Sequence, residues 1–107
     1  MNGILERHKS AISEICNAFG VSKLEVFGSA TRSDFDPAES DFDFVLEFSV
    51  YGPDSARRFI GFADALEALL GRRVDLVFDR AMKPRFRDQI ASQREVIFER
   101  ADRSIAA

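Results

Sequence analysis

Two short motifs carry residue types with which proteins hold phosphate and metal ions. Phe27-Gly28-Ser29 ends a hydrophobic stretch with a glycine-serine pair, and Asp41-Phe42-Asp43 places two carboxylates two residues apart. A small-residue turn after a strand exposes backbone N–H groups that can bind a phosphate. Two aspartates separated by one residue on a strand point to the same face, about 6.6 Å apart, where they can bind one Mg²⁺. The two motifs together indicate chemistry on a nucleoside triphosphate.

A third carboxylate, Asp75, lies in a hydrophobic run whose other members alternate with it. If that run forms a strand beside the Asp41–Asp43 strand, Asp75 stands on the same surface as the pair. Three carboxylates on one face can hold two Mg²⁺ ions, one for the triphosphate and one that lowers the pKa of an attacking hydroxyl. Asp75 can also accept the proton of that hydroxyl. Gly28, Ser29 and Arg32 are then the candidate phosphate-binding residues.

Hydrophobic periodicity predicts the elements that position these residues. Apolar residues three and four apart predict a helix over residues 4–19 ending at Gly20, and a second over residues 56–70, with Phe59 and Ile60 on its buried face, ending at Gly71. Pro84 fits the first turn of a third helix. Strands are expected over residues 24–27, 42–48, 73–78 and, at an edge of the sheet, 95–98, with a loop over residues 34–40.

This order of elements predicts an α+β fold, with a small mixed sheet of about four strands covered by helices mainly on one face. The face opposite the phenylalanines of the Asp41–Asp43 strand is then free for chemistry. At 107 residues the chain is expected to form a single domain over residues 1–100, with residues 101–107 as a disordered tail.

Composition narrows the function classes. A net charge of -3 argues against a broad nucleic-acid-binding surface. The single Cys16 excludes an internal disulfide, and the sequence contains no long apolar run and no recognisable signal peptide. A cytoplasmic protein that does not enter membranes is therefore expected.

The combination of motifs resembles the nucleotidyltransferase superfamily that includes DNA polymerase beta and kanamycin nucleotidyltransferase, and within it the minimal, MNT-type branch. The resemblance spans residues 24–78. Gly28-Ser29 matches the family's Gly-Ser motif, Asp41 and Asp43 its paired metal ligands, and Asp75 its third carboxylate, which implies the polymerase beta-like fold.

The sequence departs from the family pattern at two points. Ser33 follows Arg32 where the family commonly has glycine, and eleven residues, rather than ten, separate Gly-Ser from Asp-x-Asp. Loops tolerate an extra residue, so a modest change of turn geometry is expected.

The resemblance implies transfer of a nucleoside monophosphate, most often AMP from ATP, to an acceptor hydroxyl with release of pyrophosphate and the help of two Mg²⁺ ions. Many minimal members are antitoxins that bind a HEPN-type toxin and, in some cases, AMPylate it, so such a toxin is the expected partner. Two alternatives stay open. One is an antitoxin that covers the toxin without catalysis, and the other is transfer to a small molecule such as an aminoglycoside, in a cleft that a homodimer completes.

Simpler interpretations apply to single residues. The three aspartates can be a solvated acidic strand face, Arg32 can pair with Asp34 or Asp36, and Ser29 can be a helix N-cap. The remaining residues are expected to be structural: His8 and Cys16 as packing residues, the pairs Arg57-Arg58, Arg72-Arg73 and Arg85-Arg87 as solvated ends of elements, and Glu47 as too distant to bind metal.

Overall fold

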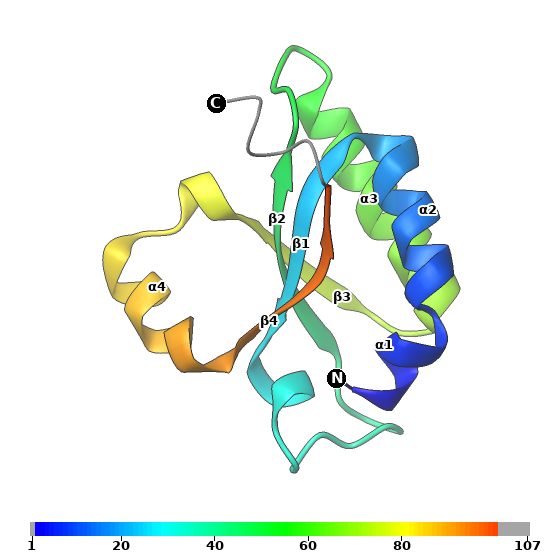
Figure 1. The fold of residues 1–107 in the computed structure, drawn as a ribbon, viewed down its shortest axis with the longest axis vertical. Helices are drawn as coiled ribbons and strands as arrows, with labels where there is room; N and C mark the ends of the chain where they lie inside the picture. The colour runs from blue at the N-terminus through cyan, green and yellow to red at the C-terminus, as the bar shows by residue number, and fades with distance from the viewer. Residues whose placement is uncertain (1, 101–107) are drawn as a thin grey trace.

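The computed structural model describes residues 2–100, which form a four-stranded sheet with helices on both faces (Figure 1). The expected order of helices and strands is confirmed, while the predicted tail, residues 101–107, lies outside the described residues. The helices are α1 (Gly3–Arg7), α2 (Lys9–Phe19), α3 (Ser55–Leu70) and α4 (Pro84–Ile90), and the strands are β1 (Val21–Phe27), β2 (Phe42–Phe48), β3 (Val74–Phe78) and β4 (Arg94–Glu99). Three 3₁₀ turns, η1 (Gly28–Thr31), η2 (Asp79–Ala81) and η3 (Ala91–Gln93), join them.

The sheet is mixed, with strand order β3-β2-β1-β4. β1 pairs antiparallel with both β2 and β4, whereas β2 and β3 are parallel and are connected through α3. A parallel pair needs a crossover connection of this kind, and the helix provides it. β4 lies at an edge, as expected.

The main hydrophobic core lies between the sheet and the layer formed by α1, α2 and α3 (Figure 1). Alternate residues of β2 enter it, because successive side chains of a strand point to opposite faces. Its fully buried large side chains include Phe42, Phe44, Leu46, Leu24, Phe62, Leu66, Leu5 and Ile12.

The opposite face of the sheet is covered at its centre, where the sequence predicted a free surface. Val45, on the aspartate side of β2, is 1% exposed and packs with Met82 and Ile90, at the two ends of the segment that contains α4. Phe27 and Val77 pack against the same cluster. The prediction of a free surface was wrong at this point. The segment from Met82 to Ile90 contributes few buried apolar residues, and the sequence pattern does not show that they pack on Val45.

The N-terminal helix is divided at His8, although the sequence predicted one helix over residues 4–19. His8 has φ -104° and ψ 11°, ends α1 and precedes α2. Asn2 caps α1 by accepting a hydrogen bond from the N–H of Ile4 at 2.9 Å. Leu5 and Ile12 on either side of the division are both fully buried, so the bend keeps both segments packed on the core.

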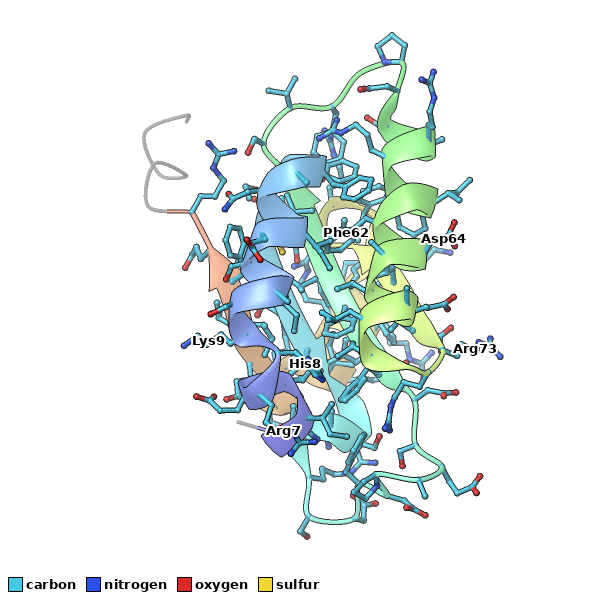
Figure 2. The ribbon with its side chains drawn as sticks, turned by 90° about the vertical axis from the view of Figure 1, so that its right-hand side faces the viewer. Arg7, His8, Lys9, Phe62, Asp64 and Arg73 are labelled. Atoms are coloured by element: carbon cyan, nitrogen blue, oxygen red, sulfur yellow. The ribbon has the colours of Figure 1, made fainter. Side chains whose placement is uncertain are left out.

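One residue predicted on the buried face of α3 is exposed, and another residue of the helix is buried instead. Ile60 is 61% exposed, whereas Phe62 is fully buried, together with Leu66, one turn further along the helix. Figure 2 shows Phe62 between α2 and α3. Gly61 allows the two helices to approach closely, because a Cβ at this position would lie 2.7 Å from the ring of Phe19.

Two arginines predicted to be solvated are packed on aromatic rings. The guanidinium of Arg58 lies 4.0 Å from the ring centroid of Phe48, and its Nε donates a hydrogen bond to the carbonyl of Phe19. Arg72 lies 5.3 Å from the ring centroid of Phe42. Periodicity alone missed both, because long basic side chains pack their stems on apolar surface.

None of the helices within residues 2–100 is long and apolar enough to cross a membrane.

Candidate active site

Gly28 follows the last residue of β1 in a backbone conformation that favours glycine, with φ +76°. A Cβ at this position would also lie 3.1 Å from Oδ2 of Asp43. The turn and the carboxylate are therefore in direct contact. The sequence analysis explained Gly28 by the access of phosphate to the backbone. The structure adds a second reason, the close approach of Asp43.

The turn after Gly28 is a short 3₁₀ segment held by its own atoms. Thr31 Oγ1 donates a hydrogen bond of 2.7 Å to the carbonyl of Gly28, and Ala30 is buried. Phe27 is the N-cap residue and no side chain caps the turn, so the interpretation of Ser29 as an N-cap is wrong. Ser29 lies partly exposed in the turn next to Gly28.

Asp43 and Asp75 face each other on neighbouring strands. The parallel register of β2 and β3 pairs Asp43 with Asp75, so the predicted adjacency of the two strands and their matching faces are confirmed. Burial raises the pKa of Asp43, and the negative charge of Asp75, a hydrogen bond with its carboxyl and the charge of Asp41 raise it further. The structure thus brings two of the three predicted carboxylates together.

Asp41 lies one residue before β2, whose bounds are those expected, and is exposed. Its charge reaches Asp43, but within residues 2–100 no group of three or more acidic, histidine or cysteine side chains is arranged to hold a metal ion. Asp43 and Asp75 are therefore the assembled part of the candidate site, with Asp41 at its rim.

The donor set fits Mg²⁺, because this ion commonly takes one or two carboxylates and completes its shell with water and substrate phosphate. Burial and the neighbouring carboxylate of Asp75 both make the ionised form of Asp43 costly and raise its pKa. A divalent cation between the two carboxylates would offset that cost. The absence of a Cβ at Gly28 leaves room for the Asp43 carboxyl to lie close to the turn.

Arg32 is engaged by two side chains at the end of the turn. Its Nε donates to Oδ1 of Asp34 at 3.0 Å, and its Nη1 donates to Oε1 of Gln93 at 2.7 Å. The alternative of a salt bridge is confirmed for Asp34, whereas Oδ1 of Asp36 accepts from the N–H of Ala38. Arg32 thus connects the η1 turn to the segment that begins β4.

Sequence reasoning missed an ion-pair network on the same face of the sheet. Arg94 donates to both carboxylate oxygens of Glu25, which is 7% exposed, and to Oδ1 of Asp79, which also accepts from Arg87. Burial opposes the ionised form of Asp79, but the hydrogen bonds from Arg87 and Arg94 outweigh it and lower the pKa of that carboxyl. Glu25 between the apolar Leu24 and Val26 was the available signal, because a charge within a buried strand needs a partner.

The fold and the site have the features of an enzyme that works on nucleotide phosphates: a glycine turn, a carboxylate pair beside it, and a mixed sheet that supports both. The family model described as "Nucleotidyltransferase domain" matches residues 8–101. The chain therefore belongs to this family and is a nucleotidyltransferase.

Individual relatives agree with this assignment. The protein adenylyltransferase MntA of Thermococcus cleftensis is 39% identical over 83 residues, 78% of each chain. A solved minimal nucleotidyltransferase is 31% identical and superposes with a TM-score of 0.70, covering 85% of this chain and 90% of that one. An MNT antitoxin from Shewanella oneidensis, solved in complex with a tri-AMPylated HEPN toxin, has the same fold at 19% identity, with a TM-score of 0.63 over 96% of this chain and 80% of that one.

Proposed function

We propose that this nucleotidyltransferase transfers AMP from ATP to a hydroxyl of a HEPN-type toxin and thereby acts as its antitoxin in the cytoplasm. The single observation that carries the catalytic part is the contact of Gly28 with Asp43, which itself faces Asp75. The relative named protein adenylyltransferase supports AMP as the transferred group. The solved complex of an MNT antitoxin with an AMPylated HEPN toxin supports the partner.

In this reaction the acceptor oxygen attacks the α-phosphorus of ATP. The new O–P bond forms as the bond between the α-phosphorus and the bridging oxygen breaks, and pyrophosphate leaves with that oxygen. Asp75, whose side chain is 54% exposed, would accept the proton of the acceptor hydroxyl. The backbone N–H groups of the turn at Gly28 and Ser29 bind phosphate oxygens.

Asp41, Asp43 and Asp75 would hold Mg²⁺, two ions when nucleotide is bound. Bound there, Mg²⁺ neutralises phosphate charge and favours the deprotonated acceptor.

Arg32 has a different part in this proposal from the one that the motif suggests. Its bonds to Asp34 and Gln93 hold the turn against the start of β4, so it fixes the position of Gly28 and Ser29. To contact a phosphate directly, Arg32 would have to leave its ion pair with Asp34. That ion pair is exposed and contributes little net stability.

The test uses the protein co-purified with the product of its neighbouring gene, α-labelled ATP and Mg²⁺. We expect label on the partner and one pyrophosphate released per AMP transferred. Asp41→Ala combined with Asp43→Ala should lower transfer at least about 100-fold, since each removes a carboxylate that would hold Mg²⁺ against the negatively charged phosphate. The matched control is Asp64→Ala with Asp88→Ala, which removes two exposed carboxylates from α3 and α4 and should leave transfer unchanged.

Three results separate the possibilities. Equal transfer by the two double variants would contradict the assigned residues. Neutralisation of the toxin by the Asp41→Ala, Asp43→Ala variant, without any transfer by the native protein, would indicate an antitoxin that works by binding alone. Label on an added aminoglycoside but not on the protein partner would indicate a small-molecule acceptor.

A further inference from the structure

A cavity lies between α1 and the loop that joins η1 to β2. It has a volume of about 580 Å³, which is in the range of small-ligand sites. Its described lining consists of Asn2, Gly3, Ile4, Arg7, Phe35, Pro37 and Arg72. The two charged side chains in this lining are both arginines, and no carboxylate belongs to it.

This cavity is separate from the candidate active site. Ile4 and Phe35 pack against the main core, on the helix-covered face of the sheet. Asp43 and Asp75 project from the other face, because they alternate along their strands with the core residues Phe42, Phe44 and Val74. The cavity and the carboxylate pair thus lie on opposite faces at the same end of the sheet.

Arg7 brings a positive charge to the α1 side of the cavity (Figure 2). Its guanidinium lies beside the start of the helix, since a Cβ at Gly3 would be 3.9 Å from its Nη1. The residue is exposed and, within residues 2–100, forms no ion pair with a carboxylate. Its charge is therefore available to a ligand in the cavity.

Arg72 brings a second positive charge, held in place by aromatic rings and one hydrogen bond. Its guanidinium carbon lies 5.3 Å and 5.9 Å from the ring centroids of Phe42 and Phe35, and its Nη1 donates to the carbonyl of Ser40 at 3.0 Å. Its Nε is buried without a hydrogen-bond partner. A buried donor without a partner is unfavourable, and more so when it is charged. Arg72 also has no carboxylate partner within the described part of the chain.

We propose that this cavity binds a phosphate group, with Arg7 and Arg72 as its cationic ligands. A planar guanidinium matches the geometry of phosphate, and two of them facing one hollow without a carboxylate favour a dianion over a neutral ligand. Among the acidic side chains of the adjoining loop, Asp34 pairs with Arg32 and Asp36 caps its own turn. The other two, Glu39 and Asp41, do not belong to the lining of the cavity. The proposal does not rest on the transfer reaction or on the toxin partner.

The phosphate can belong to a free inorganic ion or to a nucleotide, and one titration distinguishes them. Amide NMR spectra of the ¹⁵N-labelled protein are recorded without Mg²⁺ against inorganic phosphate, pyrophosphate and AMP, with sodium chloride at matched ionic strength as reference. We expect saturable shifts at Gly3, Ile4 and Phe35. Tighter binding of AMP than of inorganic phosphate would assign the site to a nucleotide, and equal or weaker binding would assign it to the free ion.

Variants then test the two arginines. Arg7→Gln should weaken phosphate binding at least tenfold, while Arg57→Gln, the same charge change on the exposed surface of α3, should leave it unchanged. Arg72→Lys keeps the charge but loses the fork and should also weaken binding, with thermal melting as a check on its folding. Equal affinities of the Arg7→Gln and Arg57→Gln variants would overturn the proposal. So would shifts centred on Gly28 and Ser29, or shifts that never saturate.

Discussion

At the residue scale, the contact between Gly28 and Asp43 can be separated from the backbone strain that any side chain would cause at Gly28. Gly71 has a similar φ, +67° against +76°, but a Cβ there would meet nothing within 4 Å. Gly28→Ala and Gly71→Ala should each cost about 1–2 kcal/mol for the left-handed conformation. Only Gly28→Ala should also displace the Asp43 carboxyl and lower transfer at least about tenfold. Urea unfolding and the transfer assay measure the two effects, and equal loss of transfer in both variants would contradict the contact.

Asp43 should also make the stability of the metal-free protein depend on pH. Its pKa is raised in the folded state from the ordinary value of 3.8, so the folded state favours the protonated form. Stability therefore falls as the pH rises from about 3.8 through the raised pKa. In EDTA at pH 7, Asp43→Asn should raise the melting temperature by about 2–4 °C, a figure reduced for the exposed part of the carboxyl. The gain should vanish near pH 3, and a gain of the same size there would show that charge is not its cause.

At the scale of elements, the ion pairs of Arg94 fasten β4 and the η2 turn to the centre of the sheet. The side chains of Glu25 and Arg94 are 10% and 16% exposed, so removing Arg94 leaves a nearly buried carboxylate that keeps only the longer ion pair with Lys23, at 3.8 Å, among the described residues. Arg94→Met should destabilise the fold by about 3 kcal/mol in urea unfolding. Arg73→Met, which removes an arginine 73% exposed and 3.5 Å from Asp75, should change stability by less than about 1 kcal/mol.

The double variant tests the cause of that loss. Glu25→Met with Arg94→Met also removes the carboxylate of Glu25 and should recover part of the stability. A double variant as unstable as Arg94→Met alone would mean that lost packing, not the buried charge, causes the effect.

Asp79, in the same network, adds a pH dependence of the opposite sign to that of Asp43, because its pKa is lowered in the folded state. Its contribution to stability is present above about pH 3.8 and is lost as the pH falls below that value.

The contrast between Asp75 and Arg94 explains which elements the sequence predicts. Asp75 and Asp43 lie on the same face of the sheet because side chains alternate along each strand. This local rule needs only that the two strands are neighbours. Arg94 meets Glu25 across 69 residues, and Arg32 meets Gln93 across 61, through a register that no local pattern encodes. The sheet, the main core and the pairing of Asp43 with Asp75 were therefore predictable, whereas the position of Asp41 at the rim was not. The cover over Val45 and the partner of Arg32 depend on tertiary contacts.

At the scale of the whole molecule, one strand supports both hydrophobic clusters and the carboxylate pair. Phe44 of β2 belongs to the main core and Val45 to the cluster under α4, while the partly buried Asp43 lies on the same face of the strand as Val45. The geometry of the site therefore exists only when both layers are packed on the sheet. A ligand of the carboxylates should stabilise the entire domain, because it binds the folded state alone.

Thermal melting with and without Mg²⁺ tests this coupling. At ten times its dissociation constant, Mg²⁺ should stabilise the native protein by about 1.4 kcal/mol, and EDTA should reverse the change. Asp43→Asn with Asp75→Asn should abolish the response, because the two carboxylates that face each other across β2 and β3 are gone. Asp64→Asn with Asp88→Asn removes the same charge from exposed helix positions and should keep it. The same stabilisation by Mg²⁺ in both double variants would place the ion elsewhere on the protein and would separate the stability of the fold from the carboxylate pair.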